Sequence, residues 1–179
     1  MIAVETRNLT LSTLSFGVCF AVWSIFSIIG IEIKQDLGLN ETEFGLLIAT
    51  PILTGSLTRI FLGIWADQYG GRSVFFAVMV LTAIATWMLS MASTYPMFLL
   101  SALGVGLAGG SFAVGITFVS CWYGKDRQGM MLGIFGMGNA GAAVTSFCAP
   151  FLLVAYGWDN VAKIYSVALL VMAVIFWIF

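Results

Sequence analysis

The sequence predicts an all-α membrane protein, and three observations support this fold class. Of its 179 residues, 61% are hydrophobic and only 8% are charged, and the mean hydropathy is +1.06. A soluble domain carries about 25% charged residues, so this chain lacks the polar groups that a surface in water needs. Its apolar residues form continuous runs of about 20, which is the length of a helix that crosses a bilayer. The runs lack the period-two alternation of membrane barrel strands.

Six such runs follow one another, with short polar connections between them. We expect helices over residues 9–31, 44–66, 73–92, 96–122, 130–156 and 161–179, which together form one six-helix bundle over residues 1–179. Pro96 suits the start of the fourth helix, and Asp159 with Asn160 offers a cap before the sixth. The residues "EIKQDLGLNETE" form the only sizeable predicted loop, between the first two helices.

The basic residues predict the orientation of the bundle in the cell membrane. With the N-terminus in the cytoplasm, four basic residues face inward and two face outward, which satisfies the positive-inside rule. The inward group is Arg7, Arg72, Lys125 and Arg127, and the outward group is Lys34 and Lys163. The chain ends at "VIFWIF", inside its last apolar run. We therefore expect it to be part of a longer, multi-pass polypeptide.

Composition also argues against several classes of function. The net charge of −1 offers no basic surface for nucleic acid. The chain has no histidine, and its three cysteines are far apart, so we expect no metal site and no cofactor. It shows no nucleophile–base pair and no phosphate-binding loop, so we assign no catalytic residue and do not expect an enzyme.

One arginine stands inside an apolar run, in "LTGSLTRIFLGIWADQYGGRS". Arg59 lies 15 residues into the predicted second helix, about 22 Å along its axis. We expect all eight carboxylates to fall at helix ends or in loops, leaving Arg59 without an ionic partner at its depth: Glu5, Glu32, Asp36, Glu41, Glu43, Asp67, Asp126 and Asp159. Two interpretations follow. Arg59 either reaches the interface or a helix carbonyl, or it lines a cavity where a mobile anion supplies the missing charge.

Glycines mark the other notable segments. Gly63, Asp67, Gly71 and Arg72 lie in and around a turn between the second and third helices. We expect Asp67 to cap a helix end or to pair with Arg72, with the glycines allowing a tight turn.

Small residues form a stripe on the fourth helix, where Ala102, Gly106 and Gly110 recur every four residues. Such a stripe favours close packing of helices in lipid. Phe112 lies just beyond it and is a candidate wall of a cavity, although packing explains it equally well.

The fifth helix carries "QGMMLGIFGMGNAGAAV", with Asn139 among the glycines 133, 136, 138 and 141. Each glycine makes a helix about 1 kcal/mol less stable than alanine does, so four glycines in one helix indicate that a close contact or an exposed backbone is needed there. The segment either packs tightly against another helix, with Asn139 bonding across, or exposes a surface where a small planar anion lies. Gly136, Gly138 and Asn139 are the candidate substrate contacts under the second interpretation.

Taken in order, "TGSLTRI", "DQYGGR", "GGSFAVG" and "GIFGMGNAG" resemble the nitrate/nitrite porter family of the major facilitator superfamily. The resemblance covers nearly all of the chain but only the N-terminal six-helix half of such a porter. Gln68 replaces a basic residue of the superfamily loop motif. The resemblance implies that Arg59 binds the anion, that Asn139 and its glycines form a substrate surface, and that Phe112 lines the site. It also implies that the turn carrying Asp67 and Arg72 is a gating loop.

The expected function is therefore secondary transport of nitrate, nitrite or both by alternating access, together with a C-terminal half that carries a second arginine. Symport and exchange both stay open, because no carboxylate is expected inside the membrane. Two alternatives remain: a porter of the same superfamily for another small or organic anion, and a six-helix membrane subunit that does not transport. The partners expected are nitrate or nitrite, the lipid bilayer and the missing half.

Overall fold

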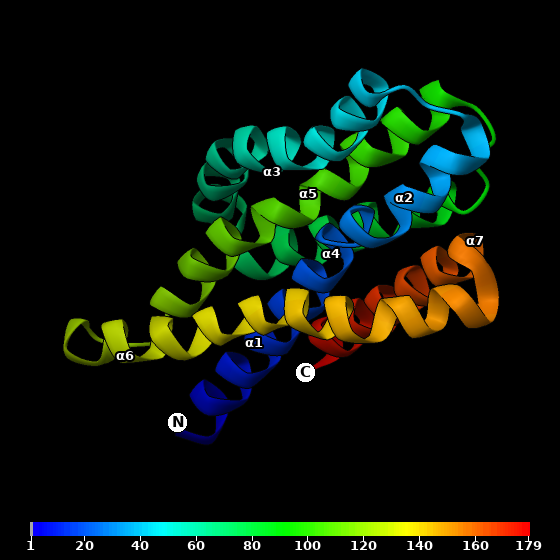
Figure 1. Cartoon of the computed structure of the whole chain (residues 1–179). Coiled ribbons are helices and arrows are strands. Elements are labelled where there is room, and N and C mark those ends of the chain that lie inside the picture. Colours follow the sequence, from blue (N-terminus) through cyan, green and yellow to red (C-terminus); the bar gives the residue numbers. More distant parts are fainter. Residues whose placement is uncertain (1) are drawn as a thin grey trace.

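The computed structural model describes residues 2–179 and confirms an all-helical membrane fold (Figure 1). The described residues form seven α-helices and one 3₁₀ turn in this order: α1 Ile2–Trp23, α2 Phe26–Leu37, α3 Glu41–Tyr69, α4 Gly71–Leu89, α5 Tyr95–Ser120, α6 Lys125–Gly136, η1 Met137–Asn139 and α7 Ala140–Ile178. Among these residues, five stretches are long and apolar enough to cross a membrane: Val4–Leu37, Glu41–Tyr69, Gly71–Leu89, Tyr95–Ser120 and Lys125–Ile178.

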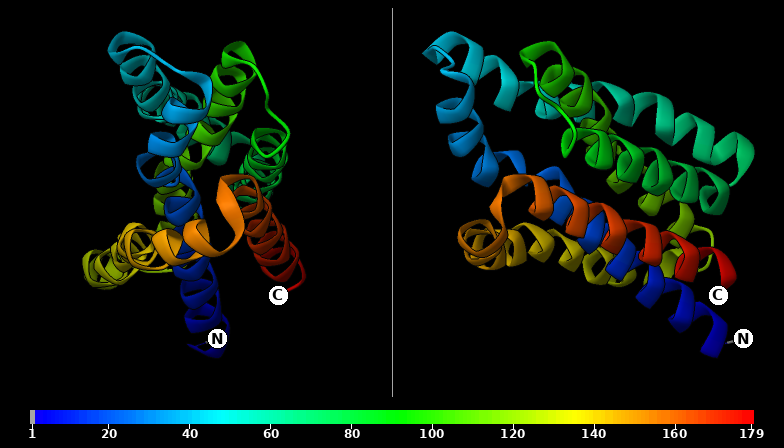
Figure 2. Two further views of the ribbon diagram at one scale, coloured as in Figure 1. Left: turned by 45° about the vertical axis from the view of Figure 1, so that its right-hand side comes forward. Right: turned by 90° about the vertical axis from the view of Figure 1, so that its right-hand side faces the viewer.

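The last stretch contains more than one pass of chain. Its 54 residues double back at Gly157, whose φ of 77° and ψ of 162° lie outside the helical region. Figures 1 and 2 show α7 turning there and running back along the bundle. We call residues 140–156 the first limb of α7 and residues 158–178 its second limb. Glycine at the turn is explained by its positive φ, which side chains with a Cβ rarely adopt.

The first stretch is broken rather than straight. Helix α1 ends at Trp23 and α2 begins at Phe26, with a turn at residues 24–25. Helix α2 then continues through the first half of the predicted loop and stops at Gly38, whose φ is 63°. Glu32 and Asp36 therefore lie on a helix and not in a loop. Sequence reasoning stopped this helix at its polar residues, whereas the positive-φ glycine determines its end.

Helix α3 shows how its sequence sets its start. Asn40 accepts a hydrogen bond from the Glu43 backbone N–H at 2.9 Å, and the Glu43 carboxylate accepts one from the Asn40 N–H at 3.0 Å. This capping box satisfies two donors that a helix start leaves free. The helix continues through Pro51 in its interior.

Helix α5 packs against α3, α4 and α1, and α1 packs in turn against α7. Small polar side chains join helices across the apolar interior. Thr145 donates to the Ala21 carbonyl at 2.9 Å, and Ser166 donates to the Ala83 carbonyl at 2.7 Å. Such bonds stabilise helix association in lipid, where the hydrophobic effect between helices is absent.

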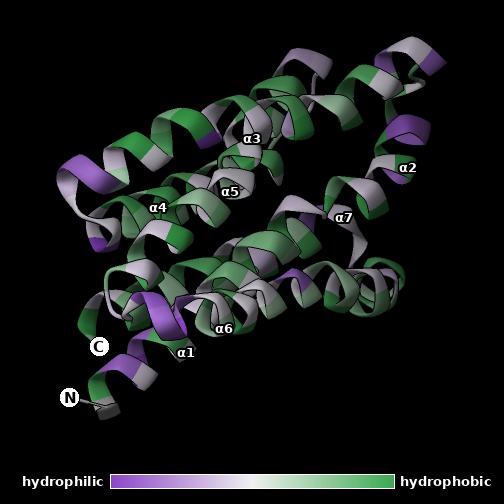
Figure 3. Ribbon diagram, turned by 90° about the vertical axis from the view of Figure 1, so that its left-hand side faces the viewer, coloured by the Kyte–Doolittle hydropathy of each residue, from purple (hydrophilic) through white to green (hydrophobic). Residues whose placement is uncertain are grey.

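Polar residues gather near the helix ends (Figure 3). The N- and C-terminal ends of the described chain lie at the same end of the bundle (Figure 2). Arg72 also lies at this end, because its Nη2 donates to the carbonyl of Phe176 near the C-terminus at 3.3 Å. At the opposite end, the Trp158 indole donates to the Asp36 carboxylate at 2.9 Å and joins α2 to the turn in α7.

Candidate functional site

Arg59 extends from α3 toward α5 within the bundle. Its Nη2 donates to the backbone carbonyl of Gly109 at 3.1 Å. Its Nε is buried and has no hydrogen-bond partner. Across the described residues, the ion pairs are Lys34–Glu41 and Lys163–Asp159, and neither involves Arg59. Arg59 therefore contacts a helix carbonyl, as the first interpretation of the sequence predicted, and it has no carboxylate partner among the described residues.

Glycine brings the two helices close enough for this bond. A Cβ on Gly55 of α3 would lie 2.9 Å from the Gly106 carbonyl oxygen and 3.2 Å from the Gly109 Cα. A Cβ on Gly106 would lie 2.8 Å from the Pro51 carbonyl oxygen, and one on Gly110 would meet the Leu62 side chain. A Cβ closer than about 3 Å to backbone atoms cannot be accommodated without backbone movement, so Gly55 and Gly106 require glycine, whereas at Gly110 the clash is with the end of a flexible side chain. The sequence predicted close packing of the small-residue stripe on α5, and the structure shows that Gly106 and Gly110 of this stripe pack against α3.

Phe112 contacts Arg59 directly. The guanidinium carbon lies 5.7 Å from the centroid of the Phe112 ring, within the range of a cation–π interaction. The ring also lies 5.5 Å from Phe16 of α1 and 6.1 Å from Phe135 of α6. Phe16 and Phe135 stack at 4.9 Å. We call Phe16, Phe112 and Phe135 the phenylalanine cluster, and Phe135 itself lies within the glycine-rich segment, between Gly133 and Gly136.

The glycine-rich segment contains a break in the helix. Residues Met137–Asn139 form a 3₁₀ turn between α6 and α7. Asn139 is exposed at this turn, and its Nδ2 donates to the Gly136 carbonyl at 2.9 Å. An amide has two N–H donors and a carbonyl acceptor, so this single bond leaves capacity for another ligand.

The four glycines of this segment fall on two different faces. A Cβ on Gly138 would lie 2.9 Å from the Thr13 carbonyl oxygen, and one on Gly141 would lie 2.8 Å from the Gly17 carbonyl carbon. A Cβ on Gly133 or Gly136 would meet nothing within 4 Å. The predicted close packing applies to two of the four glycines, whereas Asn139 bonds within its own segment and not across to another helix. Gly138 and Gly141 pack against α1, whereas Gly133 and Gly136 leave an open backbone surface.

The turn between α3 and α4 also differs in detail from its predicted form. Gly70 has a φ of 88°, and a Cβ on Gly71 would lie 2.8 Å from the Phe118 Cβ, so glycine is required for the turn and for its contact with α5. Asp67 is exposed. Arg72 does not pair with Asp67 as predicted, and its Nη2 donates to the backbone carbonyl of Phe176 instead. The Arg72 Nε is buried without a partner. Gly63 lies within α3, where an added Cβ would be 3.8 Å from the Ala113 Cβ of α5, an ordinary contact.

Sequence reasoning missed two aromatic side chains that complete this region. Phe16 and Trp23 lie seven residues apart on one face of α1, a spacing that predicts a shared face but no partner. The Trp23 indole donates to the Pro51 carbonyl at 3.1 Å. The indole also packs closely against Gly109, because a Cβ added at Gly109 would lie 3.0 Å from the indole nitrogen. Trp23 thus packs against the same α3–α5 contact that positions Arg59.

These features define a multi-pass helical membrane protein with an arginine between its helices. The family model of the Major Facilitator Superfamily matches residues 11–179, and the chain belongs to this superfamily.

Relatives with curated names agree with the resemblance seen in the sequence. The chain is 42% identical over 183 aligned residues to the "Probable nitrate/nitrite antiporter NarK1" of Thermus thermophilus, covering 96% of this chain and 41% of the relative. It is 36% identical over 168 residues to the "Probable nitrate transporter NarT" of Staphylococcus epidermidis, covering 94% of this chain and 43% of the relative. These relatives are named as transporters and not as enzymes. The chain spans about two fifths of their length.

A solved structure supports the fold. An inward-facing, unoccupied bacterial homologue of the human lysosomal transporter Spinster superposes with a TM-score of 0.83, covering 97% of this chain and 42% of that chain. The sequence identity is 19%, so this likeness concerns the fold alone.

Proposed function

We propose that this chain forms part of a secondary transporter for nitrate and nitrite, in which Arg59 holds the anion. The observation that carries the proposal is the electrostatic state of Arg59. Arg59 lies in a membrane-length helix. Its guanidinium donates to one neutral carbonyl and has no carboxylate partner among the described residues. An arginine at the centre of a membrane helix costs at least about 2.5 kcal/mol, so its retention indicates a function.

An oxyanion satisfies this arginine better than any other ligand. The guanidinium has five N–H donors in a planar fork, and Gly109 accepts from only one of them. Nitrate and nitrite are planar and present two oxygens in the geometry that the fork recognises. Their negative charge also compensates the cation without a titratable protein group. Arg59 as a whole is only partly buried, although its Nε is buried.

The open glycines and Asn139 supply a second surface for the same anion. Gly133 and Gly136 present bare backbone, and the Asn139 amide projects beside Gly136. A flat anion lies against such a surface at close range and accepts a bond from the remaining amide hydrogen. Gly138 contributes packing against α1 instead, and so holds the turn that presents Asn139.

Transport requires a second wall facing these residues. The relatives are more than twice as long as this chain, which leaves room for another bundle of similar size. We propose that such a C-terminal bundle carries a second cationic residue and that the two bundles rock around the anion. In this arrangement the turn with Asp67 and Arg72 moves with the bundle end, where Arg72 ties α4 to the end of α7. The N-terminus lies in the cytoplasm.

Counterflow in proteoliposomes tests the substrate class. The protein is expressed from its full reading frame, and vesicles loaded with unlabelled nitrate are placed in labelled nitrate. We expect labelled nitrate to accumulate, nitrite to compete with it, and larger carboxylate anions such as succinate to compete at least tenfold less well. Equal competition by succinate would contradict a nitrate site and favour an organic-anion porter. Absence of any counterflow in folded protein would favour a subunit that does not transport.

A further inference from the structure

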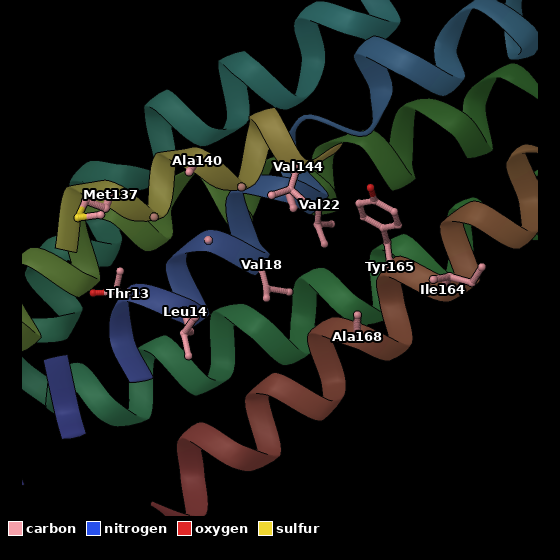
Figure 4. Close-up of a pocket in the computed structure, with 14 residues that line it drawn as sticks. Thr13, Leu14, Val18, Val22, Met137, Ala140, Val144, Ile164, Tyr165 and Ala168 are labelled. Carbon is pink, nitrogen blue, oxygen red and sulfur yellow. The ribbon is translucent and has the colours of Figure 1, made fainter. Parts of the chain in front are cut away.

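A cavity that Arg59 does not line lies between α1 and the two limbs of α7 (Figure 4). It is an open groove of about 500 Å³, within the range of known small-molecule sites. Leu14 and Val18 of α1, Val144 of the first limb, and Ile164 and Ala168 of the second limb form its walls. Thr13 lies at one end of the groove and Tyr165 near the other.

Glycine contacts explain why the protein does not fill this groove itself. Gly138 and Gly141 pack directly against Gly17 of α1, so these three contact positions place no side chain in the groove. Ala140 and Ala168 add only methyl groups to the walls. The turn at Gly157 connects the two limbs of α7 at one end, and Figure 4 shows α1 between the two limbs.

The chemistry of the lining excludes an inorganic anion. The walls are almost entirely hydrocarbon, and the Thr13 hydroxyl already donates to the Leu9 carbonyl at 2.8 Å. The Tyr165 hydroxyl is the other polar side-chain group of the lining, and one neutral donor does not replace the hydration of a desolvated anion. The groove is formed by segments of membrane-length apolar stretches, so it lies at the depth of the lipid chains. An alkyl chain is the chemistry that this groove accepts from its surroundings.

A cation lies on the same face of α1 as Leu14, on the N-terminal side of the groove. Arg7 precedes Leu14 by seven residues, which is two helical turns and about 10.5 Å along α1. Arg7 is exposed and belongs to neither ion pair of the described residues. This end of the bundle also carries Arg127, which shares a pocket with Glu5 and Thr6 of α1. An anionic headgroup next to a helix end of this kind is attracted by the basic side chains.

We propose that this groove is a binding site for an anionic phospholipid, with one acyl chain lying between α1 and α7 and the phosphate paired with Arg7. The groove and Arg7 do not include Arg59, so the lipid proposal is independent of the proposed anion site. It holds whether or not the protein transports nitrate. The apolar groove sets affinity for the chain, and Arg7 sets the preference for a negative headgroup.

Two pairs of variants test the site in protein expressed from its full reading frame and purified with phosphatidylglycerol or phosphatidylcholine. Ala168→Phe places a ring in the groove, and Ala155→Phe places the same ring on an exposed position of the first limb outside it. Native mass spectrometry counts the lipids that stay bound. We expect Ala168→Phe to reduce bound phosphatidylglycerol at least fivefold and Ala155→Phe to leave it unchanged.

The second pair separates the headgroup from the chain. Arg7→Gln should abolish the preference for phosphatidylglycerol over phosphatidylcholine while some lipid still binds, and Lys125→Gln, an exposed cation at the start of α6, should preserve that preference. Equal lipid retention in Ala168→Phe and wild type would overturn the proposal. So would a groove covered by a second copy of the protein, seen as a dimer that Ala168→Phe dissociates without loss of lipid.

Discussion

Arg59 of α3 donates a hydrogen bond to the Gly109 carbonyl of α5 at 3.1 Å, across a contact that only glycine permits. The bond uses one of the five donors of the guanidinium and neutralises none of its charge. The α3–α5 packing therefore orients the cation without satisfying it. This combination of fixed position and unbalanced charge is what a reversible anion site requires, because the anion must bind and leave.

Replacing Arg59 by lysine tests the importance of the planar fork. Lysine keeps the positive charge but loses bidentate geometry and the stacking of a flat cation on Phe112. We expect Arg59→Lys to raise the KM for nitrate at least tenfold in counterflow, with normal insertion and amount in the membrane. Arg127→Lys, at an exposed position of α6, is the matched control and should transport normally. An unchanged KM in Arg59→Lys would remove Arg59 from the site.

The contact between α3 and α5 predicts a large difference between two glycines of one helix. A Cβ on Gly55 would press on Gly106 and Gly109, whereas a Cβ on Gly45 would meet nothing within 4 Å. Gly55→Ala should lower stability by about 1–3 kcal/mol, as overpacking does in well-packed interiors. Thermal unfolding in detergent measures the change. Gly45→Ala should unfold at or above the wild-type temperature, and equal melting of the two variants would show that the α3–α5 contact is looser than described.

The two faces of the glycine-rich segment predict opposite kinds of defect. Gly141→Ala should destabilise the protein, because its Cβ would collide with the Gly17 backbone. Gly136→Ala should leave stability unchanged or slightly raised, since alanine favours helix by about 1 kcal/mol and the space is open. Its expected defect is a several-fold higher KM for nitrate. A normal KM together with normal stability in Gly136→Ala would mean that the open surface does not touch the substrate.

The proposed orientation predicts which side of the membrane a reagent reaches. In a cysteine-free background, Lys163→Cys should react with a membrane-impermeant maleimide in intact cells. Lys125→Cys should react only after the membrane is permeabilised, since it starts α6 at the end where Arg127 neighbours Glu5. The reverse labelling pattern would place the N-terminus outside.

Sequence alone predicted the helical class, the isolation of Arg59 and the close packing of α5, because these follow from composition and from residue spacing. It did not assign each glycine near Asn139 to a face. That assignment depends on the rotation of the helix and on the 3₁₀ turn at Met137–Asn139, which tertiary packing determines. It also missed Trp23 and Phe16, whose partners come from other helices. The hydrogen bond from Arg72 to the Phe176 carbonyl could not be predicted for the same reason. The two residues are 104 positions apart in the chain.

The structure of the protein from its full reading frame, determined with nitrate present, tests the central claim most directly. We expect density for a planar anion within about 3.2 Å of the Arg59 guanidinium and beside the Phe112 ring, with the Asn139 amide turned toward the same ligand. Arg59 bound instead by a carboxylate from outside this chain, or turned out to the lipid headgroups with nitrate located elsewhere, would contradict the account.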